Sequence, residues 1–427
     1  MNESLALPDY DIAIVGGGMV GSVLAGLLSA SGAGWRTVLI DAGVPDRLAS
    51  AHYSSHYDNR STAISAGSAD ILERLGLWSR LKTHATAITE VHVSDQGHLG
   101  GALIDAREQQ RDALGYVLEN GWLAPTLRTA AVQAPEVKIL APAQVTGLLP
   151  GRHLNTLTLK GESTPGTLTA RLVVLADGGA SELHRQLGIE QVRHDYQQHA
   201  VIANVSFERP HNGRAYERFT PRGPLALLPL DECPQAQRAA LVWTLPPGEA
   251  DALRNAPEAE FLDALQQAFG WRLGRLTRVG ERQSWPLALV QAREQVRSRL
   301  VLLGNSAHYL HPVAGQGFNL SLRDAAALAA GLRRARQEGA DPGALPVLNR
   351  YVAQRARDQR LTIQLSDKLV RVFSNRRLGL MALRHLGFVG LDFLPGVKDW
   401  FAAQTMGTAG PRAPWEPSVQ RLSEVGS

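Results

Sequence analysis

The sequence predicts an α/β fold with two sheets and a helical C-terminal region. Three observations support this prediction. An apolar strand pattern at residues 11–15 runs directly into closely spaced glycines and a helical pattern. Residues 200–243 show alternating patterns typical of antiparallel strands, and the chain from residue 324 onward is mainly helical in pattern. A strand pattern of the parallel type returns at 300–303, so we expect the first domain to be discontinuous.

The glycines after the first strand fit the spacing G-x-G-x-x-G as Gly16, Gly18 and Gly21. The first glycine permits a tight turn, the second lets a pyrophosphate approach the backbone, and the third allows the helix to pack closely on the strand. Because the pattern lies between a strand and a helix, it predicts a Rossmann-like dinucleotide-binding unit. A glycine turn before a buried helix, without a ligand, is the alternative interpretation.

Two further features fit a dinucleotide. The helical pattern begins at Met19 and Val20, where the free backbone N–H groups of a helix start would face the phosphates. A second strand pattern, residues 37–40, ends in Asp41, 20 residues after Gly21. A carboxylate at this spacing accepts hydrogen bonds from an adenosine ribose. Without a dinucleotide, Asp41 would cap the next loop.

Composition limits the classes of function. The 427 residues fit two or three domains, and 44% hydrophobic with 20% charged residues is a globular balance. The net charge of +4 is spread through the chain and leaves no nucleic-acid footprint. Cys233 is the single cysteine, so no disulfide forms within the chain, as in a reducing compartment. Without a signal-peptide pattern or an apolar run of about 18 residues, we expect a cytoplasmic protein, with peripheral membrane contact as an open alternative.

The remaining patterns place helices and strands along the chain. The expected helices are residues 68–78, 122–132 and 258–269. The expected strands are residues 89–94, 138–145, 155–159, 168–170, 172–176, 200–207, 215–219, 225–229 and 239–243. A long polar loop, residues 42–59, leads to Arg60 beside the expected dinucleotide site. Arg60 either holds a phosphate or is an ordinary surface arginine.

Three separated stretches carry a resemblance to a known family. They are GGGMVG at 16–21, LADGGASELHR at 175–185 and GNSAHYLHPVAGQGFNLSLRD at 304–324. Together they resemble the fingerprints of the single-component FAD monooxygenases, which are aromatic hydroxylases of the p-hydroxybenzoate hydroxylase-like fold. Within that family, the stretch HPVAGQGFN is similar to the signature of the ubiquinone-biosynthesis hydroxylases. A closer likeness, to the 2-octaprenyl-6-methoxyphenol hydroxylase branch, lies in VHVSDQGH at 91–98, GRAYERFT at 213–220 and AFGWRLG at 268–274.

The patterns and the resemblance together imply three parts. The first is a discontinuous Rossmann-like FAD domain of residues 1–78, 109–185 and 296–345. The second is a substrate domain with an antiparallel or mixed sheet, made of residues 79–108 and 186–295. The third is a C-terminal helical region with a loose tail, residues 346–427.

The resemblance also assigns cofactor-binding residues. It implies that FAD is held by Gly16, Gly18, Met19, Val20, Gly21, Asp41, Arg60, Arg128, Val145, Asp177, Asn305, Pro312, Gly315, Gly317, Phe318 and Asn319. In this set Asp41 holds the adenosine ribose and the backbone at Val145 meets the adenine. Asp177 lies near the pyrophosphate and is a candidate for the approach of NAD(P)H. The chain departs from the family at two positions, because Asn305 stands where Asp is usual and Ser321 where the ubiquinone branch usually has Gly.

The implied reaction has two halves. NAD(P)H gives a hydride to FAD, and reduced FAD with O₂ forms a C4a-hydroperoxide that passes one oxygen atom to the ring of a polyprenyl phenol. The flavin-side loop and helix start, with Pro312, Gly315, Gln316 and Gly317, would stabilise negative charge on the flavin. No second G-x-G-x-x-G follows a strand, so NAD(P)H is expected as a transient co-substrate.

No catalytic base can be identified from the sequence, and a phenol substrate has little need of one because its hydroxyl group activates the ring. His308 and His311 flank the flavin motif, and structural and functional roles are equally open for them. We expect no metal, since neither H-E-x-x-H nor C-x-x-C occurs. The apolar strand residues at 225–228 and 241–243 would exclude water from the reaction, or would be ordinary core.

Several alternatives accompany this interpretation. A flavin halogenase shares the FAD domain, but its W-x-W-x-I-P stretch is absent. A flavin-dependent reductase of an isoprenoid substrate and a non-catalytic flavin-binding scaffold for other ubiquinone-biosynthesis proteins remain as alternatives. The C-terminal region, with Trp400 and Phe401 in its apolar set, either packs on the FAD domain or meets a membrane or a partner that delivers lipid.

Overall fold

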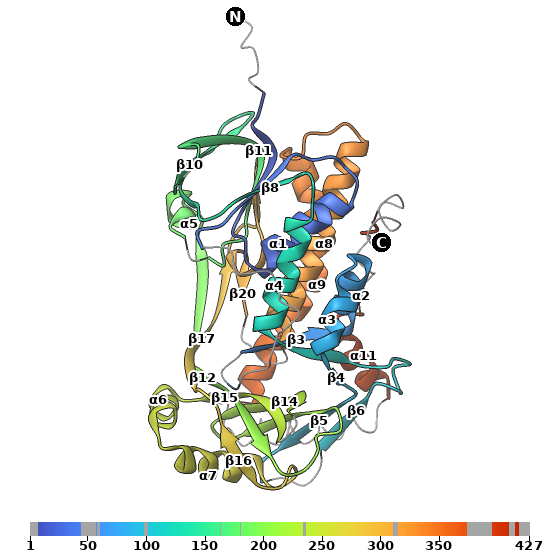
Figure 1. Ribbon diagram of the computed structural model, residues 1–427, viewed down its shortest axis with the longest axis vertical. Coiled ribbons are helices and arrows are strands. Elements are labelled where there is room, and N and C mark those ends of the chain that lie inside the picture. The colour runs from blue at the N-terminus through green and yellow to red at the C-terminus, as the bar shows by residue number, and fades with distance from the viewer. Residues whose placement is uncertain are drawn as a thin grey trace, which may run out of the picture.

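The computed structural model describes residues 7–43, 57, 60–97, 101–162, 164–179, 181–233, 236–310, 315–373, 395–409 and 415–417. The described residues form three sheets and several long helices. Figure 1 places the first sheet at the top and the second sheet at the bottom, with two long strands running from below the first sheet down into the second. The predicted site residue Pro312 lies outside the described residues, as does His311.

The first sheet has eight strands and a parallel centre. Its parallel strands are, in spatial order, β19 (Leu300–Leu302), β11 (Thr167–Leu175), β1 (Tyr10–Val15), β2 (Thr37–Ile40) and β8 (Val137–Leu140). The antiparallel additions are β18 (Val296–Arg297), β9 (Gln144–Leu149) and β10 (Asn155–Lys160). The parallel pairing of β19 with β11 confirms the parallel strand predicted at residues 300–303.

Three predicted strands of this sheet have the wrong bounds. The predicted strand at 138–145 is two strands, because Pro142 has no N–H for a ladder and the N–H of Ala143 donates to the carbonyl oxygen of Asp41 at 2.7 Å. The predicted strands at 168–170 and 172–176 are one continuous strand, β11. Its first half pairs with the antiparallel arm β10, and its second half pairs with β1 and β19.

Long helices cover one face of the first sheet: α1 (Met19–Ala30), α4 (Asn120–Val132), α8 (Gln316–Gln337) and α9 (Leu345–Phe373). They share one apolar core with the sheet, which Leu24, Leu123 and Leu328 represent. Helices α1 and α4 approach closely at Gly26, where an added Cβ would lie 2.6 Å from the Cβ of Ala130. Figure 1 shows α1, α4, α8 and α9 running side by side.

A turn divides the helix predicted at residues 68–78. The structure has α2 (Ala66–Arg74), then a turn, then the short α3 (Trp78–Leu81) and the 3₁₀ turn η1 (Lys82–His84). Gly76 adopts a positive φ of 78°, which no helical residue has. Glycine takes this conformation without steric cost, so the helix ends before it.

The second sheet has nine strands. Its strands are, in spatial order, β20 (His308–Tyr309), β17 (Gln283–Ala292), β12 (Gln191–Phe207), β15 (Ala236–Leu245), β14 (Gly223–Cys233), β13 (Arg214–Thr220), β5 (Glu90–Asp95) and β6 (Gly101–Asp105), with β16 (Leu276–Val279) beside β12. Helices α6 (Pro247–Asn255) and α7 (Glu258–Phe269) cover one face of it. The predicted helix 258–269 and the predicted antiparallel strands are confirmed, with longer strands than expected.

A small third sheet lies against part of the second sheet's uncovered face, which is the face opposite α6 and α7. It has the order β3 (Ser61–Ser65), β7 (Gly115–Glu119) and β4 (Thr86–Ile88). Ile88 and Val117 from this sheet pack with Ala215, Leu230 and Ala240 from the second sheet. The predicted domain boundaries remain predictions, because contacts of this kind run across them.

The C-terminal part contributes helix α11 (Pro395–Thr405). Ala402 and Met406 pack with Ala66 of α2 and Ile104 of β6. Packing therefore accounts for this side of α11, whereas Trp400 is 49% exposed. Of the helices in the described ranges, none is long and apolar enough to cross a membrane.

Candidate functional site

Glycine turns follow three neighbouring parallel strands at the same edge of the first sheet. Gly16 directly follows β1, Gly178 comes three residues after the end of β11, and Gly304 comes two residues after the end of β19. All three have positive φ, which is 106° for Gly16, 74° for Gly178 and 66° for Gly304. The register places Val15 beside Leu175, and Leu175 beside Leu302. The three turns are therefore adjacent at the carboxyl ends of the strands, where open α/β sheets bind ligands.

The first turn has the geometry that its glycines predict. An added Cβ at Gly16 would lie 2.5 Å from the carbonyl oxygen of Ala176, and one at Gly21 would collide with the carbonyl oxygen of Gly16. At Gly18, by contrast, no described atom lies within 4 Å of an added Cβ. Gly18 is exposed at the start of α1, with Met19 and Val20 partly exposed beside it. The start of this helix is open to an anion.

Asp41 lies beside this turn. Its carboxylate accepts hydrogen bonds from the backbone N–H of Gly17 at 2.5 Å and from the N–H of Gly43 at 2.8 Å. Two carboxylate oxygens have about four acceptor sites, so Asp41 retains capacity for ribose hydroxyls. Val145 follows closely after Ala143, whose N–H bonds to the backbone of Asp41. Its place in β9 is consistent with the predicted contact of its backbone with adenine.

The two predicted arginines differ in their surroundings. Arg128 of α4 is only 9% exposed, and its guanidinium makes no hydrogen bond or ion pair with any residue in the described ranges. Burying a guanidinium without a partner costs free energy, and a bound anion would compensate for that cost by pairing with it. Arg60 is exposed, and its guanidinium carbon lies 5.6 Å from the centre of the Trp285 ring of β17. Arg60 therefore lies against β17 of the second sheet.

Asp177 is held in a hydrogen-bond network between the second and third turns. Its carboxylate accepts from the Ser306 hydroxyl at 2.6 Å, from the N–H of Gly179 at 3.0 Å and from the N–H of Ser181 at 3.2 Å. Burial alone would raise the pKa of Asp177, but the hydrogen bonds from Ser181, Ser306 and Gly179 outweigh burial and lower it. Asp177 is therefore ionised at neutral pH. Asn305, in the 3₁₀ turn η2 (Gly304–Ser306), is exposed beside it.

The start of α8 is the second open helix terminus of the site. Gly315 caps it with a φ of 59°, and no described atom lies within 4 Å of an added Cβ at Gly317. Phe318 packs partly against the first core, and Gln316 donates to the carbonyl oxygen of Thr405 at 3.0 Å. Among the residues that the structure describes, none blocks Gly317, so the N–H groups here and the positive end of the helix dipole can meet negative charge.

Asn319 uses its side chain to hold β3 against this helix start. Its Oδ1 accepts from the N–H of Ser65 at 2.8 Å, and its Nδ2 donates to the carbonyl oxygens of Ala63 at 2.9 Å and Gly315 at 2.8 Å. The amide group is thus occupied within the protein. Asn319 positions the elements around the site, and its predicted contact with a cofactor stays a prediction.

His308 lies in a buried ionic cluster behind the site. Its Nε2 is 3.3 Å from Oδ2 of Asp324, which pairs with Arg355 at 2.5 Å. Burial would raise the pKa of Asp324, but Arg355 and His308 lower it to about 2. Asp358 joins Arg355 to Arg323 in the same cluster. Of the two roles considered for His308, this geometry supports the structural one.

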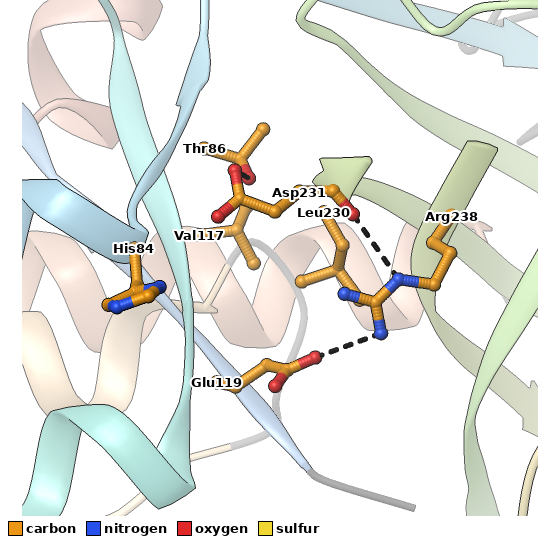
Figure 2. A pocket seen from close by; sticks show the side chains of 7 residues that line it. All are labelled: His84, Thr86, Val117, Glu119, Leu230, Asp231 and Arg238. Atoms are coloured by element: carbon orange, nitrogen blue, oxygen red, sulfur yellow. Dashed lines mark hydrogen bonds and ion pairs between the residues drawn. The ribbon is translucent and has the colours of Figure 1, made fainter. Parts of the chain in front are cut away.

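Sequence reasoning missed a second buried ion pair, between the second and third sheets. Arg238 of β15 lies 3.2 Å from Glu119 of β7, and they line a cavity of about 10 Å³, with room for about one water molecule (Figure 2). Figure 2 also shows Arg238 donating to the carbonyl oxygen of Asp231. A larger cavity of about 370 Å³ lies between α8 and α9, beside Arg334 and Tyr351. In the described part of the chain, no group of three His, Cys, Asp or Glu side chains could hold a metal ion.

Comparison with known proteins gives the family. A sequence profile described as "FAD binding domain" matches residues 9–366. The chain is 37% identical over 409 residues to the ubiquinone hydroxylase UbiL of Rhodospirillum rubrum, and the aligned region covers 95% of this chain and 91% of that protein. It is 33% identical over 385 residues to the 3-demethoxyubiquinol 3-hydroxylase of Escherichia coli, covering 90% and 94% of the two chains. The p-nitrophenol 4-monooxygenase PnpA of Pseudomonas putida superposes with a TM-score of 0.74 at 21% identity, over 94% and 98% of the two chains, and confirms the predicted fold class.

The residues of the site fit FAD. Two open helix starts, at Gly18 and Gly317, supply backbone N–H donors, and Arg128 is a buried cation that finds no anion within the described ranges. A pyrophosphate and an electron-accepting ring require donors of these kinds. The profile match and the two relatives show that the chain belongs to the FAD-dependent monooxygenases, in the family that contains the ubiquinone-biosynthesis hydroxylases.

Proposed function

We propose that the protein hydroxylates the aromatic ring of a polyprenyl phenol, of the 2-polyprenyl-6-methoxyphenol type, in ubiquinone biosynthesis. FAD is its cofactor, NAD(P)H is a transient co-substrate, and O₂ supplies the oxygen atom. The observation that carries this proposal is the likeness to a ubiquinone hydroxylase over 95% of the chain, because it includes the second sheet as well as the FAD-binding part. The second sheet is the part of the chain that the FAD fingerprints do not explain.

In this proposal different residues of the site bind different parts of FAD. The turn at Gly16, Gly18 and Gly21 and the start of α1 hold the pyrophosphate, with Arg128 as the charged partner. The start of α8 at Gly317 stabilises negative charge on the ring system. FAD, when bound, supplies the redox chemistry by accepting a hydride and transferring one oxygen atom from O₂ to the substrate.

The uncovered face of the second sheet offers an apolar wall that suits a prenylated ring. Ile202, Ala226, Leu228 and Val242 point to this face and are partly exposed. The alternate residues of the same strands, including Leu225 and Trp243, are buried under α6 and α7 and belong to the core there. The wall expected from residues 225–228 and 241–243 therefore uses only every second side chain. Such a wall keeps water from the reacting ring.

The specific substrate is tested by spectroscopy and turnover. The purified protein should show the visible absorption of bound FAD, and a short-chain prenyl methoxyphenol should stimulate NAD(P)H oxidation. Mass spectrometry should then detect a product heavier by one oxygen atom. Bound FAD without stimulation by any phenol would contradict the hydroxylase proposal and favour the isoprenoid reductase, which anaerobic reduction of a substrate double bond would identify, or the scaffold.

Peripheral membrane contact is proposed for the C-terminal part, to explain how a lipid-soluble phenol reaches the site. Trp400 of α11 is 49% exposed, while Ala402 on the same helix is buried. An exposed tryptophan on a packed helix suits a membrane interface. Liposome flotation should fall when Trp400 is replaced by Ser, and Trp271→Ser, at another exposed tryptophan, is the matched control. Equal flotation of the wild type and Trp400→Ser proteins would contradict the proposal.

A further inference from the structure

Glu217 of β13 lies on the uncovered face of the second sheet. Its neighbours in sequence point the other way, as shown by Tyr216, whose ring centre lies 5.3 Å from that of Phe269 on α7. Side chains alternate between the two faces of a strand, so Glu217 points away from α6 and α7. It pairs with Ala226 of β14 and Val93 of β5.

One row of side chains crosses the uncovered face at the level of Glu217. The row runs, through paired positions on six neighbouring strands, from Gln283 to Ile202, Val242, Ala226, Glu217 and Val93. Glu217 is the single carboxyl group in it, among apolar side chains and one amide.

The rows on either side fix where this row lies in the molecule. The neighbouring row on one side contains Ala215 and Ala240, and these residues pack against Val117 of the third sheet. The other side is the row of Trp285, two positions from Gln283 along β17, and Arg60 lies against the Trp285 ring. The row of Glu217 therefore runs between a row that packs against the third sheet and a row that carries Trp285, and Glu217 lies four strands across the sheet from β17.

Glu217 has no partner in the described part of the chain. It makes no hydrogen bond and no ion pair there, although it is only partly exposed. Burial among apolar neighbours raises its pKa to about 7. The other charged groups near this face include Asp95 of β5, the Glu119–Arg238 pair two rows away, and Arg60 beside Trp285. Asp231 of β14 accepts a hydrogen bond from Thr86 at 3.1 Å, and the guanidinium carbon of Arg278 lies 4.1 Å from the centre of the Tyr57 ring. Helix α9 contacts β14, and its Asp367 accepts a hydrogen bond from Tyr196 at 2.8 Å. A carboxyl group without a partner, on a face otherwise suited to an apolar ring, is the feature of a site that receives a hydrogen-bond donor.

We propose that Glu217 binds the phenolic hydroxyl of the substrate and acts as the general base of ring hydroxylation. The proposal rests on the proposed function. The ionised carboxylate accepts the hydrogen bond of the phenol and takes its proton as the ring donates electrons to the incoming oxygen atom. The phenol O–H bond breaks, the carboxyl O–H bond forms, and the released electron pair moves into the ring. The ring would then form the new C–O bond to the oxygen atom that FAD supplies, and FAD would keep the electron pair of the bond that this oxygen atom leaves. When the resulting dienone loses its ring proton to water, Glu217 returns its proton to the substrate oxygen, so no net charge is left on the protein.

The test compares Glu217→Gln with Glu260→Gln, a matched change at an exposed glutamate on α7, across the sheet. Both variants should bind FAD with the wild-type absorption spectrum. Glu217→Gln should lower the rate of product formation by about 10²-fold, a typical effect of losing a general base. It should also lose the rise of kcat/KM with pH near 7, while NAD(P)H oxidation continues without product. Glu260→Gln should match the wild type in each measurement.

A binding measurement tests the same residue without turnover. A prenylated nitrophenol bound to the oxidised enzyme reports its ionisation by phenolate absorption. In the wild type above pH 7, ionised Glu217 should oppose the phenolate and raise the pKa of the bound probe, and Glu217→Gln should lower that pKa. The same probe pKa in both proteins, or an unchanged pH profile of Glu217→Gln, would overturn the assignment. A wild-type enzyme that hydroxylates no phenol, yet shows the shifted probe pKa, would instead overturn the proposed function and leave Glu217 as a phenol-binding residue.

Discussion

Replacing Arg238 should destabilise the protein strongly, although the ion pair that it makes adds little by itself. Arg238 is 1% exposed and Glu119 is 5% exposed, so both charges are removed from water. The pair joins β15 of the second sheet to β7 of the third sheet (Figure 2). It therefore holds the third sheet against the face that carries Glu217.

The separation of 3.2 Å allows an estimate of the energies. At an effective dielectric constant of about 20, two unit charges at this distance attract by about 5 kcal/mol. Desolvation of the two ions costs several kcal/mol each and offsets most of that attraction. Arg238→Met removes the guanidinium that pairs with the buried Glu119 carboxylate, which should lower the free energy of unfolding by about 3–5 kcal/mol. The double variant Arg238→Met/Glu119→Met should lose much less than the sum of the single variants.

Urea denaturation followed by tryptophan fluorescence, with FAD present at saturation, measures these differences. The exposed pair of Arg222 and Glu249, at 3.1 Å with side chains about half exposed, is the matched control. Arg222→Met should change the free energy of unfolding by less than about 1 kcal/mol. The reasoning is refuted if Arg238→Met costs no more than Arg222→Met, or if the double variant costs as much as the two single variants together.

Three further predictions concern the first domain. Gly21→Ala should abolish FAD binding, because the new Cβ would collide with the carbonyl oxygen of Gly16. The control is Gly331→Ala on α8, where no described atom lies within 4 Å of an added Cβ. This control protein should still bind FAD and should melt at a slightly higher temperature. Arg128→Met should weaken FAD binding, measured by fluorescence titration, by at least 10-fold, since a charged hydrogen bond contributes about 1.5–3 kcal/mol, and an unchanged Kd would contradict the phosphate assignment. Asp324, whose pKa is lowered to about 2, should contribute about 2 kcal/mol of stability above pH 4. This contribution should disappear as the pH falls from about 4 to about 2, so urea midpoints of wild type should drop more steeply over that range than those of Asp324→Asn.

Local features of the site could be predicted from the sequence because their causes are local. The tight turn at Gly16, the helix start after it and the acid at Asp41 follow from residue type and spacing within about 30 residues. The same holds for the turns after β11 and β19. Bounds were wrong where one residue interrupts an otherwise regular pattern, as Pro142 does between β8 and β9.

Features that depend on register between distant strands could not be predicted. Whether Glu217 faces α7 or the opposite side depends on strand alternation set by its pairing with β14 and β5, and the sequence pattern alone fits either face. The pairing of Arg238 with Glu119 joins residues 119 positions apart. Asn319 was predicted from its motif, but its hydrogen bonds to Ala63 and Ser65 depend on tertiary structure.

Strand β3 connects the start of α8 beside the first sheet to the uncovered face of the second sheet. At one end it follows Arg60, and along its length Ala63 and Ser65 are hydrogen-bonded to Asn319 at the start of α8. On its other side it pairs with β7, and β7 contacts the second sheet through Val117. Backbone hydrogen bonds within a sheet and buried side-chain amides leave little freedom between these elements. The third sheet therefore links the start of α8 to the uncovered face of the second sheet.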